Sequence, residues 1–262
     1  MRIFILTEEE PFYLPSFLDT VLKARRQDVK GVSITPHLAS LEKKKLKGTI
    51  GRYWDLFGPW LFFVYGLEFA WAKLLDKIPL LGGGRFHSTA KAVAAHGVPI
   101  HRPKSINGKA FLAMLAEEIK PDVIVSIACP QILKEKILKL PPMGCINVHG
   151  ALLPRYRGMM PSFWALYHGE KQGGVTVHYM TPELDAGEIL AQKMVDIARD
   201  ETLRGLMAET KELGAQALLE ALDMLESGNI RTMPNPPEEA TSFTFPTKEE
   251  AREFRRRGRR FR

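Results

Sequence analysis

The apolar run at residues 121–128, PDVIVSIA, constrains the fold of this chain more than any other feature. It does not alternate with polar residues, and such runs are typical of parallel strands that are covered on both faces. Neighbouring parallel strands need a crossover connection, which is usually a helix. Residues 108–120, directly before the run, have the apolar spacing of an amphipathic helix. The sequence therefore predicts a central strand of a helix-covered parallel sheet.

The same alternation of elements extends along the chain. We expect strands at 2–7, 29–35, 98–103, 121–128, 174–180 and 189–197, and helices at 14–26, 88–97, 108–120, 161–168 and 202–227. This order predicts an α/β fold with a doubly wound, Rossmann-like, mostly parallel sheet. Ligands of such a fold bind beyond the carboxyl ends of the strands.

The alternation is interrupted at residues 38–87, which are predicted to form an apolar helical insert. The main domain is then residues 1–228 with this insert, and residues 229–262 form an extended C-terminal segment with a basic tail. The insert holds Trp54, Trp60 and Trp71, three of the four tryptophans. Its longest uninterrupted apolar run, 57–67, is only 11 residues and too short to span a bilayer.

Two interpretations of the insert remain open. Residues 53–78 could form a buried helical hairpin that contributes to a homodimer contact. They could instead lie on an anionic membrane surface, with a basic cluster as the lipid contact, namely Lys43, Lys44, Lys45, Lys47 and Arg52. Large contiguous apolar patches are rare on monomers, so the body, a second subunit or lipid must cover this surface. We favour burial, partly across a homodimer.

The charge of the chain is concentrated locally. The formal net charge is +7, of which residues 248–262 contribute +5. This distribution argues against a protein that binds nucleic acid over its whole surface and favours one or two basic patches. The tail is interpreted as a solvated basic helix, with anionic lipid, nucleotide phosphate or tRNA as alternative contacts.

The two cysteines and the N-terminus bear on the compartment. Cys129 and Cys145 are too few for a disulfide framework, and residues 1–6 do not resemble a signal peptide. The expected location is cytoplasmic, because disulfides are rare there. Peripheral attachment to a membrane through the insert is the alternative.

Candidate catalytic residues follow the central strand, in INVHGALLPRYRG at 146–158. Asn147 and His149 are two residues apart in an extended segment, so both side chains should project from one face. An amide and an imidazole can donate to a developing oxyanion, and the imidazole can also transfer protons. Asp185 could orient the histidine, and Gly187 permits its close approach. Because the set lacks a serine or cysteine nucleophile, it indicates acyl transfer to an external amine.

Three stretches carry a resemblance to a known family: PDVIVSIACPQIL, GCINVHGALLPRYRG and PSFWALYHGEKQGGVTVHYMTPELDAGEIL. They resemble the formyltransferases that use 10-formyltetrahydrofolate, which include glycinamide ribonucleotide, methionyl-tRNA and amino-sugar formyltransferases. The resemblance covers about residues 95–200 and includes Asn-x-His-x-x-Leu-Leu-Pro and a later Asp-x-Gly, with 36 residues between His149 and Asp185. It implies formyl transfer from 10-formyltetrahydrofolate to an amine, without a metal.

The resemblance also implies roles for individual residues. Asn147 and His149 would stabilise the oxyanion, and Asp185 would position His149 and assist proton removal. The pterin pocket of the folate would be formed by Cys129, Pro130, Gln131, Ile132, Leu133, Met180, Thr181 and Leu184. Arg155, Arg157 and Gly158 would form a wall of the acceptor site. His168 and His178 are interpreted as structural histidines.

The acceptor is the least constrained part of this hypothesis. We expect a small-molecule or nucleotide-linked amine, such as an amino sugar. A methionyl-tRNA formyltransferase-like enzyme and a membrane-surface enzyme acting on a lipid-linked amine are the alternatives. Only about 35 residues follow the last long helix, too few to close a C-terminal β-barrel of the kind that tRNA-formylating relatives carry. Ala151 also stands where many relatives have serine.

Overall fold

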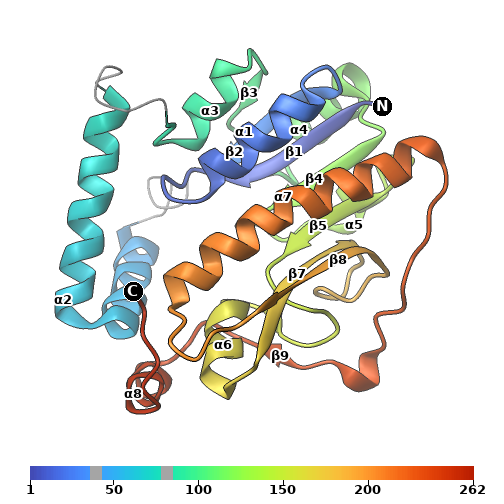
Figure 1. The fold of residues 1–262 in the computed structure, drawn as a ribbon. Helices are drawn as coiled ribbons and strands as arrows, with labels where there is room; N and C mark the ends of the chain where they lie inside the picture. Colours follow the sequence, from blue (N-terminus) through green and yellow to red (C-terminus); the bar gives the residue numbers. More distant parts are fainter. Residues whose placement is uncertain (36–42, 78–84) are drawn as a thin grey trace.

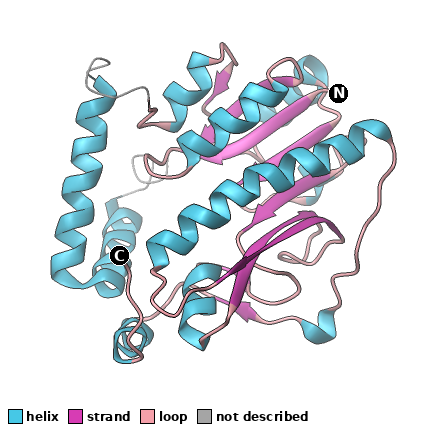
Figure 2. Cartoon of the chain, in the orientation of Figure 1, coloured by secondary structure: helices cyan, strands magenta, loops and turns pink. Residues whose placement is uncertain are grey.

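The computed structural model describes residues 1–35, 43–77 and 85–262, with the backbone alone at 43–47. It contains a seven-stranded sheet in the order β3-β2-β1-β4-β5-β7-β8 (Figures 1 and 2). The strands are β1 (Ile3–Glu8), β2 (Val29–Thr35), β3 (Ile100–His101), β4 (Val123–Ile127), β5 (Cys145–His149), β7 (Gln172–Tyr179) and β8 (Ile189–Asp196). The first five strands of this order pair in parallel, whereas β7 and β8 are antiparallel. The predicted mostly parallel α/β sheet is confirmed.

Helices cover both faces of the sheet, as expected of a doubly wound fold. One face packs against α1 (Leu14–Arg25), α3 (Thr89–Ala95) and α7 (Leu203–Ser227). The other packs against α4 (Lys109–Ala113), the π-helical turn η2 (Met114–Ile119) and α5 (Glu135–Leu138). The sequence predicted α4 and η2 as one helix and did not predict α5. All five residues of β4 are buried, which explains their unbroken apolar run.

A short helix and a separate two-stranded sheet lie beside the main sheet (Figure 1). Helix α6 (Pro161–His168) follows the short strand β6 (Arg157–Gly158), and β6 pairs in parallel with β9 (Ser242–Phe243). The C-terminal segment then passes η3 (Pro237–Glu239) and ends in the basic helix α8 (Lys248–Arg256), whose helical character was predicted. The division of the chain at 228/229 stays a prediction, although strand β9 ties the last segment to the main domain.

The insert forms helix α2 (Lys43–Lys77), as its composition predicted. Gly58 has non-helical dihedral angles (φ 69°, ψ 171°) and precedes Pro59, so the helix consists of two arms joined at a sharp break. The first arm buries Leu56 completely, in one cluster with Phe163 and Phe254. Residues 38–42 and 78–84 of the predicted insert, and the side chains of its lysine cluster, lie outside the described residues.

Most of the second arm is not buried against the described part of its own chain, so the predicted burial of residues 53–78 is met within the chain only in part. Its outer face leaves Trp60, Phe63, Leu67, Trp71 and Leu74 exposed, with Trp60 at 74%. Figure 1 shows this arm at the edge of the molecule, away from the sheet. The reason is geometric, since the break at Gly58 turns the second arm back along the first. A homodimer contact through this face stays a prediction.

Candidate active site

Strand β5 presents the first two candidate residues at the carboxyl edge of the sheet. Asn147 and His149 project on the face that carries Cys145, whereas Ile146 and Val148 pack into the opposite layer. Asn147 pairs across the strands with His178 of β7, and His149 pairs with Thr176. His149 is buried and Asn147 is half-buried. Strand β5 therefore places an amide and an imidazole next to each other at the carboxyl edge of the sheet.

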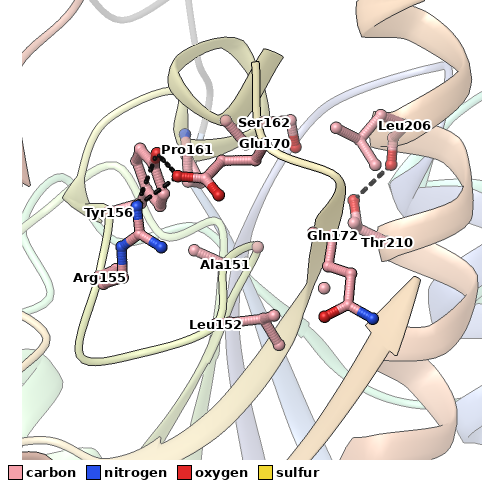
Figure 3. Close-up of a pocket in the computed structure, with 14 residues that line it drawn as sticks. Ala151, Leu152, Arg155, Tyr156, Pro161, Ser162, Glu170, Gln172, Leu206 and Thr210 are labelled. Carbon is pink, nitrogen blue, oxygen red and sulfur yellow. Dashed lines mark hydrogen bonds and ion pairs between the residues drawn. The ribbon is translucent and has the colours of Figure 1, made fainter. Parts of the chain in front are cut away.

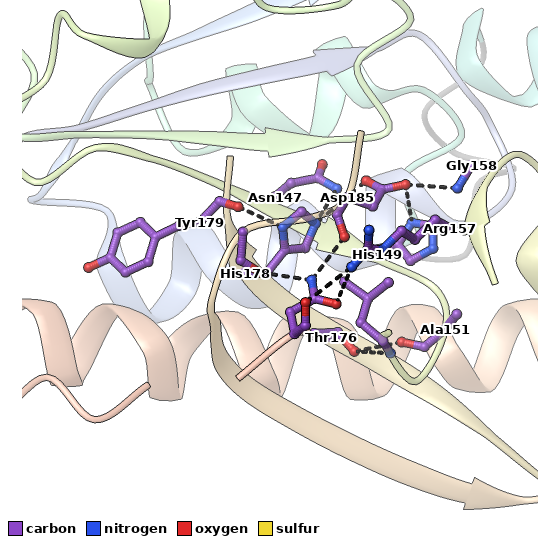
Figure 4. Close-up of polar contacts among 12 residues, drawn as sticks. Asn147, His149, Ala151, Arg157, Gly158, Thr176, His178, Tyr179 and Asp185 are labelled. Carbon is purple, nitrogen blue, oxygen red and sulfur yellow. Dashed lines mark hydrogen bonds and ion pairs between the residues drawn. The ribbon is translucent and has the colours of Figure 1, made fainter. Parts of the chain in front are cut away.

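The loop between β7 and β8 brings Asp185 to the same place (Figure 4). Its Oδ2 lies 3.6 Å from His149 Nδ1 and its Oδ1 lies 3.6 Å from His178 Nε2. The Gly158 backbone N–H donates to Oδ2 at 2.8 Å. Asp185 has a left-handed backbone (φ 51°), which is strained for a non-glycine residue. A Cβ on Gly187 would lie 2.0 Å from the Tyr179 carbonyl oxygen, so this turn requires glycine there.

Hydrogen bonds to backbone carbonyls define the proton positions on both histidines. His149 Nε2 donates to the Tyr156 carbonyl at 2.8 Å, so its Nδ1, which faces Asp185, carries the lone pair of the neutral ring. His178 Nδ1 donates to the Tyr179 carbonyl at 2.7 Å, and its Nε2 accepts from Asn147 Nδ2 at 3.2 Å. One N–H of the Asn147 amide remains to donate to a ligand.

The ionisation of the pair follows from burial and charge. Burial lowers the pKa of His149, and the Asp185 carboxylate and the Tyr156 carbonyl only partly offset this effect. Burial alone would raise the pKa of Asp185. The neighbouring His178 and His149 rings and the Gly158 amide outweigh it and lower that pKa to about 2. At neutral pH the site therefore combines a carboxylate with an uncharged histidine, which can act as a base.

The C-terminal segment contributes a residue that sequence reasoning missed. Asn235 donates through Nδ2 to the carbonyls of Asp185 and Gly187, both at 2.9 Å, and accepts from Arg157 Nη2 at 2.7 Å. Arg157 is buried, and a Cβ on Gly158 would lie 2.2 Å from the Phe243 carbonyl oxygen. Arg157 and Gly158, predicted as acceptor wall, thus lie behind Asp185 and hold its loop.

His178 was predicted as a structural histidine, yet it contacts both Asn147 and Asp185. The alternation along residues 174–180 places it on one face of its strand. However, only the pairing register of β5 with β7 brings that face to Asn147.

The residues predicted for the pterin pocket lie on two loops at the same edge of the sheet. Cys129 and Met180 both pack against the cluster formed with α4 and α5, and Leu133 is buried in it. Gln131 accepts from the Ile106 N–H at 3.1 Å, and Asn107 donates to the Ile132 carbonyl at 2.9 Å. These bonds anchor the first loop to the segment before α4. Pro130, exposed, and Thr181, half-buried, complete the two loops.

Arg155 is the predicted acceptor residue that remains open to solvent. Its side chain is about half exposed, pairs with Glu170 and lies over the Tyr156 ring at 5.3 Å. Behind it, a cavity of about 40 Å³ is lined by residues that include Ala151 and Thr210 (Figure 3). This space holds only a few water molecules, and none of the three candidate catalytic residues lines it. The cavity is therefore too small for an acceptor amine.

The cysteines are poor candidates for nucleophiles. Burial raises the pKa of Cys129 to about 11 and that of Cys145 to about 12, so both are thiols at neutral pH. Among residues 1–35, 43–77 and 85–262, no group of His, Cys, Asp and Glu side chains is arranged to hold a metal ion. The candidate site presents the amide of Asn147, the imidazole of His149 and the carboxylate of Asp185.

Comparisons with known proteins agree on one family. The model of the formyl transferase family matches residues 85–222, which is more than half of the chain. The methionyl-tRNA formyltransferase of Syntrophus aciditrophicus is 43% identical over 155 residues, covering 59% of this chain and 49% of that protein. The enzyme of the same name from Kosmotoga olearia is 38% identical over 156 residues, covering 59% and 50%. The chain therefore spans about half the length of these curated relatives.

Solved structures share the fold at low sequence identity. Phosphoribosylglycinamide formyltransferase from Anaplasma phagocytophilum superposes with a TM-score of 0.63 at 18% identity, covering 94% of this chain and 99% of that one. A sugar N-formyltransferase from a Shewanella species gives a TM-score of 0.57 at 19% identity, covering 93% and 77%. The matched residues 85–222 include Asn147, His149 and Asp185. By its sequence match and its fold, the chain belongs to the formyltransferase family.

Proposed function

We propose that this protein transfers the formyl group of 10-formyltetrahydrofolate to the amine of an acceptor. The observation that carries the proposal is the arrangement of Asn147, His149 and Asp185, in which a neutral imidazole faces a carboxylate beside a free amide N–H. This arrangement supports acyl transfer by direct attack of an amine, because the set contains no serine or cysteine nucleophile.

The division of labour follows from the hydrogen bonds. The amine nitrogen attacks the formyl carbon, and the free N–H of Asn147 donates to the oxygen that gains negative charge. His149 accepts a proton from the attacking amine at Nδ1, since its Nε2–H is already donated to Tyr156. The imidazolium so formed lies 3.6 Å from the Asp185 carboxylate, which stabilises it. The C–N bond to the folate then breaks, and the leaving folate nitrogen takes the proton from the His149 imidazolium, which returns the histidine to its neutral form.

The two loops at the sheet edge fit a flat heteroaromatic donor. Ile132 on the first loop and Leu184 on the second are exposed apolar side chains, at 77% and 60%. Ligand sites for such groups are lined by apolar side chains with a few backbone donors and acceptors. We propose that the eight loop residues from Cys129–Leu133, Met180, Thr181 and Leu184 bind the pterin, with backbone groups giving specificity.

The start of α1 bears on the class of acceptor. Helix N-termini in doubly wound folds are ready sites for phosphate. Here the Glu10 carboxylate accepts from the backbone N–H groups of Phe12, Tyr13 and Leu14 at 2.5–2.8 Å, so the chain fills this position itself. We propose that an acceptor phosphate, if present, binds near Arg155 instead. A small amine is therefore the favoured acceptor, and a nucleotide-linked amino sugar is among the candidates.

A second acceptor candidate is methionyl-tRNA. It is favoured by the names of the relatives that are 38–43% identical over 155–156 residues. The matched part spans only half of those proteins, so their acceptor site is not carried over with it.

The test is an assay with 10-formyltetrahydrofolate and three acceptors: a nucleotide-linked amino sugar, glycinamide ribonucleotide and methionyl-tRNA. Mass spectrometry detects the formylated product, and tetrahydrofolate release gives the rate. We expect transfer to one acceptor, with Asn147→Ala slower by about 10²-fold because an oxyanion donor is lost. Transfer at the wild-type rate in Asn147→Ala, or none to any primary amine, would contradict the proposal.

A further inference from the structure

The second arm of α2 presents an apolar face for which the described chain supplies no cover. We name it the tryptophan face, formed by Trp60, Phe63, Leu67, Trp71 and Leu74. Spacings of three and four residues place these side chains in one stripe along the helix. Each is between 43% and 74% exposed. At roughly 200 Å² per large side chain, the exposed apolar area is on the order of 500 Å², comparable with the largest patches on monomers.

Every acidic residue in the described part of α2 is paired with a cation of the body. Asp55 lies 3.4 Å from Lys248, and Asp76 lies 3.6 Å from Lys91. Glu68 binds both Arg204, at 2.8 Å, and Arg262, at 2.7 Å. The negative charge of the insert is therefore directed inward and neutralised.

Three basic residues of α2 with described side chains have no acidic partner within the described part of the chain. Within the described ranges, Arg52, Lys73 and Lys77 take part in no salt bridge. Arg52 lies over the Phe245 ring at 5.4 Å, and Lys73 lies over the Phe69 ring at 5.6 Å. Phe245 is half-buried, whereas the Phe69 ring is exposed. A lysine beside an exposed aromatic ring, as Lys73 is here, is typical of a helix at a lipid interface, where the cation reaches the headgroups.

We propose that the tryptophan face binds the surface of an anionic lipid bilayer, with Arg52, Lys73 and Lys77 contacting headgroup phosphates or carboxylates. A bilayer surface offers the negative charge that the face lacks and an apolar layer for the indole rings. In the described part of the chain, no helix is both long and apolar enough to cross a bilayer, so the contact is a surface one.

A second copy of the chain fits the same face less well. A symmetric dimer contact would set the tryptophan face against itself. The unpaired cations of each copy would then meet no free acidic side chain on the described part of the other copy's α2. A dimer through this face is therefore the main competing outcome of the test.

The packing of the first arm connects the proposed membrane contact with the candidate active site. Leu56 lies in the buried cluster that includes Tyr156, whose carbonyl accepts the hydrogen bond from His149. The tryptophan face is thus joined through packed side chains to the loop that follows β5. The proposal does not depend on formyl transfer, because it rests on the charges and exposure of α2 alone.

The experiment is flotation of the full chain with vesicles of phosphatidylcholine alone and of phosphatidylcholine with phosphatidylserine. We expect binding to the anionic vesicles only, with a blue shift of tryptophan emission. The double variant Trp60→Ser and Trp71→Ser should bind at least about tenfold more weakly. Replacing Lys73 and Lys77 by Gln should weaken binding by about fivefold for each cation.

The matched control is Met194→Ser, which removes an exposed apolar side chain from β8 and should leave flotation unchanged. Sedimentation of the wild-type chain without lipid separates the competing outcome. Failure of the wild-type chain to float with anionic vesicles would overturn the proposal. So would a dimer that the tryptophan variant dissociates while vesicle binding stays the same.

Discussion

The candidate active site and the tryptophan face differ in whether their side chains find partners within the chain. Around Asp185, three groups lie close to the carboxylate, namely His149, His178 and the Gly158 amide, and Asn235 binds the backbone carbonyl of the same residue. On the second arm of α2, large apolar side chains face outward with no described cover. Internal pairing makes the first region rigid and specific. Apolar exposure makes the second dependent on an external partner.

This contrast separates two kinds of function within one chain. The candidate site brings the three proposed catalytic groups together within one chain, so changes there should affect the chemical step. The first arm of the insert buries Leu56 in the core, whereas the second arm leaves its outer face exposed, so changes at these two places should differ sharply. The following predictions test this contrast from the largest expected effect to the smallest.

His149→Ala should lower kcat by about 10³-fold, because the variant loses the base that accepts the amine proton. Folate affinity should change little, since the His149 ring contacts Tyr156 and Asp185, neither of which is among the proposed pterin residues. Steady-state kinetics and folate titration measure the two quantities. An activity within a few-fold of the wild type would remove His149 from the mechanism. His168→Ala, on the nearby helix α6, is the control and should keep kcat.

Leu56→Ala should lower the free energy of unfolding by about 2–5 kcal/mol, because it opens a cavity in the cluster with Phe163 and Phe254. Urea unfolding followed by circular dichroism measures the change. A cost below about 1 kcal/mol would show that the first arm is not part of the core.

Asn235→Ala should cost about 1–3 kcal/mol of stability, since the carbonyls of Asp185 and Gly187 and the buried Arg157 lose a partner. Activity should fall with it, because the Asp185 loop loses its support. Asn229→Ala, at an exposed position of the same segment, is the control and should change neither quantity. Equal behaviour of the two variants would argue against a supporting role of Asn235.

Trp60→Ser should change the free energy of unfolding by less than about 0.5 kcal/mol, since the side chain is 74% exposed. The same urea experiment as for Leu56→Ala measures it. A large loss of stability would mean that the second arm is covered by the body or by another copy, and the contrast between the arms would fail.

Much of the fold could be predicted from local patterns in the sequence. The unbroken apolar run at β4 and the helical spacing of its neighbours indicated a covered parallel sheet, because burial on both faces requires such residues. The alternation in β5 was sufficient to place Asn147 and His149 on one face. Gly58 followed by Pro59 is a sequence signal for a helix break. The exposure of the second arm that results from this break was not predicted.

The parts that escaped prediction depend on contacts between distant segments. His178 joins the site only because β7 pairs with β5 in one register. Asn235 lies 50 residues beyond Asp185 and reaches it because the C-terminal segment returns to β6 and β8. Arg157 was expected in the acceptor wall, but the pairing of β6 with β9 buries it behind Asp185. No local pattern in the sequence predicts these contacts between distant segments.

The coupling of Asp185 to His149 is the central claim, and the pH dependence of kcat/KM tests it most directly. Activity requires neutral His149, so it should fall as the pH drops through the pKa of that residue, which burial holds below its ordinary value. The Asp185 carboxylate raises this pKa, whereas His178 and Lys211 lower it. In Asp185→Asn the acid limb should therefore move to lower pH, by about one unit or more, at a reduced maximal rate. An acid limb at the same pH in both proteins would contradict the coupling and, with it, the proposed mechanism.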